Sequence, residues 1–131
     1  MILLDTCVLI YDAITPEKLS ATAKKTIDQA YEKKQLCCSD ISLWKIAMLI
    51  QKKRIEPGID SESFLQILLD ARNIKVLSIN IPIAVLSTEQ KSIKHFDPAD
   101  RIVVATALHH HLALITPDKK IADIHELKTI W

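Results

Sequence analysis

Three aspartates, Asp5, Asp100 and Asp118, stand at positions from which their carboxylates could act together. Asp5 directly follows the apolar run Ile2–Leu4, and Asp118 follows the apolar run Leu112–Thr116. If both runs are central parallel strands, their carboxyl ends meet at one edge of the sheet, where such sheets usually bind ligands. Clustered carboxylates repel one another unless they share a cation, and a set of oxygen ligands suits Mg²⁺ or Mn²⁺. The pattern is consistent with metal-dependent hydrolysis of phosphodiesters.

Each aspartate also has a simpler explanation, in which it stabilises the start of a helix. Asp97 before a proline is typical of an N-cap, which leaves Asp100 in the first turn, where the helix dipole favours negative charge. Asp118, which follows a proline, can be explained in the same way. Asp5 is harder to explain as a cap, because a carboxylate at the end of a buried strand is costly unless it is paired or metal-bound. Both interpretations stay open at this point.

The elements that would position these aspartates follow from apolar periodicity, capping residues and prolines. The apolar residues 1–4 and 7–10 form one short stretch, which predicts a buried strand that ends near Asp5. Further strands are expected over 36–38, 74–79 and 112–116, with an edge strand over 127–131. Helices are expected over 16–34, from a cap at Ser39 or Ser42 to about 50, and over 61–71, 82–91 and 98–111, with a short helix from 118. Strands that alternate with helices at this spacing predict a parallel α/β sheet.

Length and composition narrow the class of protein. A chain of 131 residues favours one domain, residues 1–131, with a core that needs no disulfides. Hydrophobic residues make up 49% and charged residues 25%, which excludes a disordered tail protein. The single glycine excludes the glycine-rich phosphate loops of nucleotide-binding proteins. The three cysteines are a poor disulfide framework, and no apolar run approaches the ~18 residues of a membrane span, so we expect a cytoplasmic protein without membrane association.

Four segments give the chain a resemblance to the PIN-domain family, and in particular to the VapC-type ribonuclease toxins of prokaryotic toxin–antitoxin pairs. These segments span nearly the whole chain, and their order and separation make the match specific. They are Leu3–Ile10, Ser39–Ala47, His95–Arg101 and Leu114–Asp118.

The resemblance implies a three-layer α/β/α sandwich with a central, mainly parallel sheet. It also implies a Mg²⁺- or Mn²⁺-dependent endoribonuclease that leaves a 5′-phosphate and a 3′-hydroxyl. Asp5, Asp100 and Asp118 match the metal-binding and catalytic acids of the family, and Thr6 and Thr116 match the supporting hydroxyl positions. The expected partners are an RNA substrate, a cognate VapB-like antitoxin whose C-terminal segment lies across the acidic pocket, and a second copy in a homodimer.

Lys45 departs from the family pattern, because family members usually carry a glutamate at this position. If the side chain points inward, its ammonium would neutralise the three aspartates without supplying Lewis acidity, and the nuclease would be weakened or inactive. If the side chain instead reaches outward, its head lies in water. The departure leaves a non-catalytic PIN-like module that docks an antitoxin or RNA as the alternative function. A small phosphatase-like hydrolase has less support, because no phosphate-nucleophile motif is present.

Basic residues near the acids are the expected contacts for RNA phosphates. Arg101 follows one site acid, and Lys119 and Lys120 follow another. A solvated charged surface explains the same residues equally well. Trp44 and Trp131 are expected to pack in the core rather than to stack on bases, since aromatic residues make up only 5% of the chain.

Overall fold

A central sheet of five parallel strands runs through the protein, described here from a computed structural model that covers residues 1–131. The strand order β3-β2-β1-β4-β5 places β1 in the middle, paired with β2 on one side and β4 on the other. The predicted parallel α/β sheet is therefore confirmed. The strands are β1 (Ile2–Leu4), β2 (Leu36–Ser39), β3 (Lys75–Leu77), β4 (Ala113–Ile115) and β5 (Thr129–Ile130).

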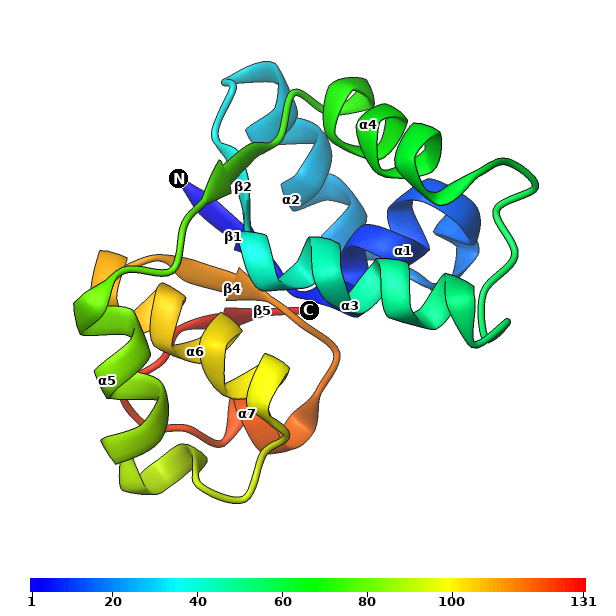
Figure 1. Cartoon of the computed structure of the whole chain (residues 1–131). Coiled ribbons are helices and arrows are strands. Elements are labelled where there is room, and N and C mark those ends of the chain that lie inside the picture. Colours follow the sequence, from blue (N-terminus) through cyan, green and yellow to red (C-terminus); the bar gives the residue numbers. More distant parts are fainter.

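Helices cover both faces of the sheet. Figure 1 shows α1 to α4 gathered on one side and α5 to α7 on the other, which gives the three-layer α/β/α sandwich. The helices are α1 (Thr6–Ile14), α2 (Ala21–Glu32), α3 (Asp40–Gln51), α4 (Ser61–Ala71), α5 (Ile81–Glu89), α6 (Pro98–His110) and α7 (Lys119–Ala122), with 3₁₀ turns η1 (Pro16–Lys18) and η2 (Lys91–Ile93). None of these helices is long and apolar enough to cross a membrane.

Successive residues of the central strands point into two separate apolar cores. Leu4 and Cys38 pack into the core beneath α1, α2 and α4, while Leu3 and Cys37 pack into the core beneath α6 and α7. This alternation is the two-residue period of a strand that is buried on both faces. It fixes the register of β1, and so it fixes where Asp5 emerges at the carboxyl end of the strand.

Two predicted elements near the N-terminus are wrong in detail. Residues 7–10 belong to α1 and not to the strand stretch, because Asp5 caps a helix that starts at once with Thr6. The helix expected over 16–34 is divided into η1 and α2, and the second of these starts after Ser20, whose side chain accepts a hydrogen bond from the amide of Ala23. Ser20 makes a capping hydrogen bond, whereas Thr15, which precedes η1, makes none through its side chain. The α-helix therefore starts after Ser20 and not at the proline.

The helix α3 is less buried than its apolar sequence predicts. Only Ser42 and Ile46 of this helix are buried, and the Trp44 side chain is 58% exposed. Trp131 is also exposed, at 38%, so the expectation that both tryptophans pack in the core is wrong. For Trp44 the reason is the position of α3, which contacts α1 and α4 on one flank and α6 on another and leaves an outer face uncovered.

Candidate active site

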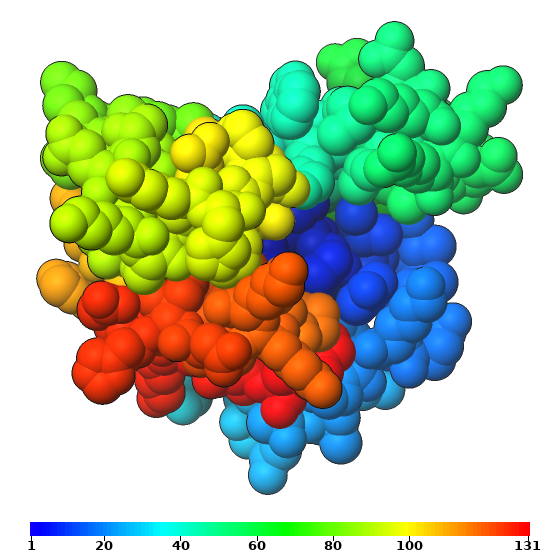
Figure 2. All heavy atoms as spheres, turned by 90° about the horizontal axis from the view of Figure 1, so that it is seen from below, coloured from blue at the N-terminus to red at the C-terminus, as the bar shows by residue number.

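A cavity of about 230 Å³ opens where β1 and β4 end. From β1 the chain adds strands toward one edge of the sheet, and it later returns to add β4 and β5 on the other side of β1. The point where the strand order reverses in this way is the usual ligand site of an open parallel sheet. In Figure 2 the dark-blue start of the chain lies in a hollow bordered by the yellow segment around α6 and the orange segment around α7. The cavity is lined by Asp5, Thr6, Cys7, Ile10, Lys45, Leu49, Asp100 and Asp118, and we call it the acidic cavity.

Asp5 is held rigidly at the floor of the acidic cavity and is only 4% exposed. One carboxylate oxygen, Oδ1, accepts a hydrogen bond from the amide of Thr6 at 2.8 Å, and the other, Oδ2, accepts one from the hydroxyl of Thr116 at 2.7 Å. The Asp5 amide in turn donates to the carbonyl of Ile115, which continues the pairing of β1 with β4. The end of the sheet therefore fixes the carboxylate before any ligand is bound.

Asp118 and the two predicted supporting threonines complete this corner. The Asp118 Oδ1 accepts hydrogen bonds from the amides of Lys120 and Ile121, so the aspartate is the N-cap of α7. Its own amide donates to the Thr116 hydroxyl at 3.1 Å, which links Asp118 to Asp5 through one side chain. Thr6 makes a 2.8 Å hydrogen bond with Ser42 of α3, a residue that the sequence analysis considered only as a helix cap.

Lys45 forms an ion pair with the start of α6. Its ammonium lies 3.1 Å from Oδ2 of Asp97 and 3.5 Å from Oδ1 of Asp100, and its side chain is only 22% exposed. The lysine therefore points inward, and the alternative of a head in bulk water is wrong. Its closest partner is Asp97, which the sequence assigned only as the helix cap, and no ion pair joins Lys45 to Asp5 or Asp118.

The electrostatics of the acidic cavity reflect burial and like charge. Burial raises the pKa of Asp5, although the hydrogen bond from Thr116 opposes this shift. The pKa of Asp100 is raised to about 6, first by burial and then by the negative charges of Asp97 and Asp5, while the Lys45 ammonium opposes the rise. Raised pKa values of several carboxyl groups in one cavity are typical of functional sites, because such sites hold like charges close together and away from solvent.

The acids fit a divalent cation in type and location. Asp5, Asp100 and Asp118 supply only oxygen ligands to one cavity, as Mg²⁺ and Mn²⁺ prefer. As the side chains stand, however, no three acidic, histidine or cysteine side chains lie close enough to hold a metal ion. The ammonium of Lys45 already contacts Asp100. A cation would therefore compete with this ammonium for the same carboxylate.

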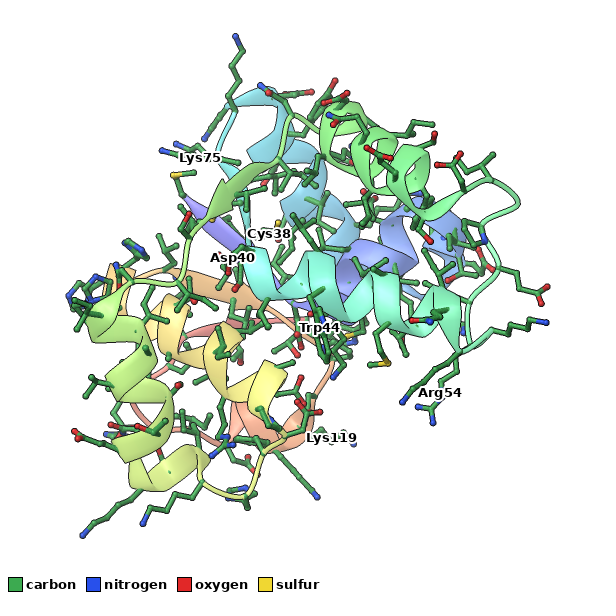
Figure 3. The ribbon with its side chains drawn as sticks, in the orientation of Figure 1. Cys38, Asp40, Trp44, Arg54, Lys75 and Lys119 are labelled. Atoms are coloured by element: carbon green, nitrogen blue, oxygen red, sulfur yellow. The ribbon has the colours of Figure 1, made fainter.

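The predicted RNA-binding residues lie outside the acidic cavity. Lys119 and Lys120 are exposed at the start of α7, directly after Asp118, and Arg101 is half-buried in the first turn of α6. None of the three lines the acidic cavity or forms an ion pair. Figure 3 shows Lys119 near the lower end of the molecule, in the region of α7. Any contact between these residues and a ligand is therefore made around the cavity and not in it.

Comparison with known proteins identifies the family. The PIN-domain family model matches residues 2–127, and the chain therefore belongs to the PIN-domain family. The chain is also 31% identical over 132 residues to "Ribonuclease VapC22" of Mycobacterium tuberculosis (strain ATCC 25618 / H37Rv). The alignment covers 99% of this chain and 98% of that protein.

Solved structures share the same fold at lower identity. The protein in the crystal structure of VapBC2 from Rickettsia felis bound to a promoter DNA fragment superposes with a TM-score of 0.73 at 16% identity, over 98% of this chain and 97% of that chain. A toxin–antitoxin complex from Klebsiella pneumoniae gives a TM-score of 0.68 at 23% identity, over 97% of this chain and 95% of that chain. These similarities confirm the PIN-like sandwich.

Proposed function

We propose that this protein is a VapC-like endoribonuclease that hydrolyses RNA phosphodiester bonds at the acidic cavity, with Mg²⁺ or Mn²⁺ as cofactor. The observation that carries the proposal is the meeting of Asp5, Asp100 and Asp118 in one cavity at the centre of the sheet. The membership of the PIN-domain family and the likeness to a protein named as a ribonuclease support it. The cytoplasm, where RNA is present and cysteines stay reduced, is the proposed compartment.

The residues of the chain would divide the work of the site. Asp5 would be the fixed ligand, because the amide of Thr6 and the hydroxyl of Thr116 donate hydrogen bonds to its two oxygens. Asp100 and Asp118, which are less buried and line the same cavity, would close around the cation. When bound, the cation would supply Lewis acidity to the scissile phosphate and lower the pKa of the attacking water. Arg101, Lys119 and Lys120 would hold the neighbouring phosphates of the RNA.

We further propose that Lys45 weakens this activity in the chain as it stands. Its ammonium contacts Asp97 and Asp100, so a divalent cation has to displace it from Asp100 before the acids can converge. A glutamate at the same place would replace this competition with a further oxygen ligand. The contacts of Lys45 also favour a second candidate function, in which the pocket is a non-catalytic docking surface for an antitoxin or RNA.

The test compares RNA cleavage in Mg²⁺ or Mn²⁺ by the natural chain, Lys45→Glu and Asp5→Asn. We expect Lys45→Glu to cleave faster than the natural chain, with 5′-phosphate and 3′-hydroxyl ends, and Asp5→Asn to show no cleavage. Equal rates for all three proteins would contradict the site. Lys45→Met is the matched control, because it removes the ammonium without adding an oxygen ligand.

Thermal unfolding in Mn²⁺ provides a readout that does not depend on cleavage. A ligand that binds only the folded state stabilises it by about 2.7 kcal/mol at 100 times its Kd. We expect Mn²⁺ to raise the Tm most for Lys45→Glu, less for Lys45→Met and least for the natural chain. If Mn²⁺ leaves all three Tm values unchanged and no protein cleaves RNA, the docking function is favoured.

A VapB-like antitoxin and a second copy of the chain are the proposed protein partners. The similar solved structures include complexes named as VapBC and as a toxin–antitoxin complex, which supports the antitoxin. In this proposal a segment of the antitoxin lies across the acidic cavity, where a cationic side chain would meet the carboxylates. The homodimer is proposed from the family resemblance alone.

A further inference from the structure

A second cavity, of about 320 Å³, adjoins the acidic cavity along α3. Lys45 and Leu49 line both cavities, so the two share one wall on the same face of the helix. The remaining wall of the second cavity is formed by Trp44, Met48, Arg54, Asp97, Pro98 and Ala99. We call this cavity the Trp44 subsite. The proposed hydrolysis at the acidic cavity does not use it.

The exposed tryptophan is the unusual feature of this subsite. The Trp44 side chain is 58% exposed, and no aromatic or cationic side chain stacks on its ring. In Figure 3 Trp44 and Arg54 both lie below the α3 ribbon, and both line the same cavity. An exposed ring and a guanidinium that line one cavity offer an aromatic face and a cation to one ligand. Each of these groups suits part of a nucleotide, since bases stack on aromatic rings and phosphates pair with guanidinium.

We propose that the Trp44 subsite binds one unpaired nucleobase of single-stranded RNA, next to the phosphodiester at the acidic cavity. This inference rests on the proposed function and names where the substrate is held. Trp44 would stack on the base, with Met48 and Pro98 as the apolar wall, and Arg54 would bind the adjoining phosphate. The base would enter beside Lys45, which separates the subsite from the carboxylates.

The charge of the acidic cavity gives a physical reason for such a subsite. Three carboxylates and one ammonium line the acidic cavity, so without a divalent cation the carboxylates outnumber the positive charge and repel a phosphate. Contacts outside that cavity would therefore add affinity for RNA that the carboxylates do not supply. Base stacking is uncharged, so it is unaffected by this repulsion and is only weakly sensitive to sequence. Arg54 adds a positive charge to the Trp44 subsite, whose wall also contains Asp97.

The test uses the fluorescence of Trp44, which is isolated by the substitution Trp131→Phe because the chain has only two tryptophans. The probe is a five-nucleotide single-stranded RNA, added in EDTA so that no divalent cation supports cleavage. We expect this RNA to quench Trp44 fluorescence. An abasic oligonucleotide with the same backbone, which carries phosphates but no bases, is expected to leave the fluorescence unchanged.

Affinity for the same RNA, measured by anisotropy, completes the test. Loss of one base–aromatic stack is expected to weaken binding by about 5-fold to 150-fold in Trp44→Ala, while Trp44→Phe retains most of the affinity. Ile81→Ala is the matched control, because Ile81 is an exposed apolar residue, at 81%, that lines neither cavity. Its affinity is expected to equal that of the natural chain.

Three results would overturn the subsite. The first is unchanged affinity in Trp44→Ala, and the second is equal quenching by the abasic oligonucleotide. The third is quenching that increases with protein concentration in the absence of RNA, because it would mean that a second copy of the chain binds at Trp44. The outcome is separable from that of the proposed function. Base-dependent quenching without cleavage by any variant would contradict the nuclease and support the subsite. Cleavage by Lys45→Glu with unchanged RNA binding in Trp44→Ala would support the nuclease and contradict the subsite.

Discussion

The two carboxylate oxygens of Asp97 have different partners. Oδ1 accepts the amide of Asp100 at 2.9 Å and so starts α6, while Oδ2 accepts the ammonium of Lys45 at 3.1 Å. Capping alone would leave the second oxygen in solvent. Asp97 therefore joins the start of α6 to the middle of α3. A movement of Lys45 would change the contacts of Asp97 and so the capping of the first turn of α6.

Asp100 provides a prediction about pH. Its folded-state pKa of about 6 lies above the ordinary value of 3.8, so the folded protein holds this proton more tightly than the unfolded chain does. The contribution of Asp100 to the free energy of unfolding is therefore largest at acid pH and falls as pH rises from about 4 to about 6. Carbon-13 NMR of the Asp100 carboxyl is expected to show a titration midpoint near 6.

Lys45→Met tests the contribution that opposes this rise in the pKa of Asp100. The ammonium lowers the pKa of Asp100, so its removal is expected to move the titration midpoint to higher pH. A midpoint that stays the same would show that Lys45 does not act on Asp100 in solution. A midpoint near the ordinary aspartate value in the natural chain would contradict the burial of the carboxyl.

The sequence predicts the acids of the site better than it predicts their contacts. The strand rule predicted that Asp5 and Asp118 meet at one edge, because it depends only on topology and strand ends, and both line the acidic cavity. Asp100 follows no strand, and it was assigned to the same site by the family resemblance. The partner of Lys45 could not be predicted in the same way. An N-cap pattern explains one oxygen of Asp97 and contains no information about the other, which depends on how α3 packs against α6.

At the scale of elements, Arg72 ties three helices together. It follows α4 and forms a two-fold hydrogen bond with Asp12 of α1, at 2.9 and 3.0 Å, and an ion pair with Asp28 of α2 at 3.2 Å. Its side chain is 26% exposed, so solvent screens these contacts only in part. The layer formed by α1, α2 and α4 is thus fixed by charge as well as by its apolar core.

Arg72→Met is expected to lower the free energy of unfolding by about 1–2 kcal/mol, because two charge-assisted hydrogen bonds are lost at a partly exposed site. Urea unfolding at neutral pH measures this change. Asp28→Asn is the control, since Asp28 is 51% exposed and makes the weaker contact, and its effect is expected to be smaller. An effect of Asp28→Asn as large as that of Arg72→Met would rule out the Asp12 contact as the main one.

Element types and capping residues were predictable over most of the chain, and the exceptions have identifiable causes. Ser39, Asp60 and Asp97 cap α3, α4 and α6 as their residue types indicate. Residues 7–10 form a short apolar run, and periodicity cannot distinguish a strand from a buried helical turn at that length. The exposure of Trp44 depends on which flank of α3 the other layers leave open, and a single helix sequence does not contain this information.

At the scale of the whole molecule, positive charge is local, because the net charge is only +1. Salt dependence of RNA binding therefore measures individual contacts. Each phosphate contact on single-stranded RNA contributes about 0.7 to the slope of log K against log salt. The double substitution Lys119→Ser with Lys120→Ser is expected to reduce this slope by about 1.4, measured by anisotropy between 50 and 200 mM salt, roughly the range in which the effect is large.

Lys24 and Lys25 on α2 provide the matched control for this measurement. They are an exposed adjacent pair like Lys119 and Lys120, and they line neither the acidic cavity nor the Trp44 subsite. Substitution of both by serine is expected to leave the slope unchanged. A slope that falls equally in the two double variants would mean that RNA senses only the overall charge of the protein.

The pairing of β1 with β4 also sets the order of events during synthesis. The side-chain hydrogen bond to Asp5 comes from Thr116, which lies 111 positions later in the chain. Likewise, β1 lacks one of its two neighbouring strands until β4 has been synthesised. A nascent chain therefore carries Asp5 without the partners that shape the cavity until Thr116 has been synthesised and β4 has paired with β1. A cavity assembled in this order cannot bind a ligand with its finished geometry before that segment has been made.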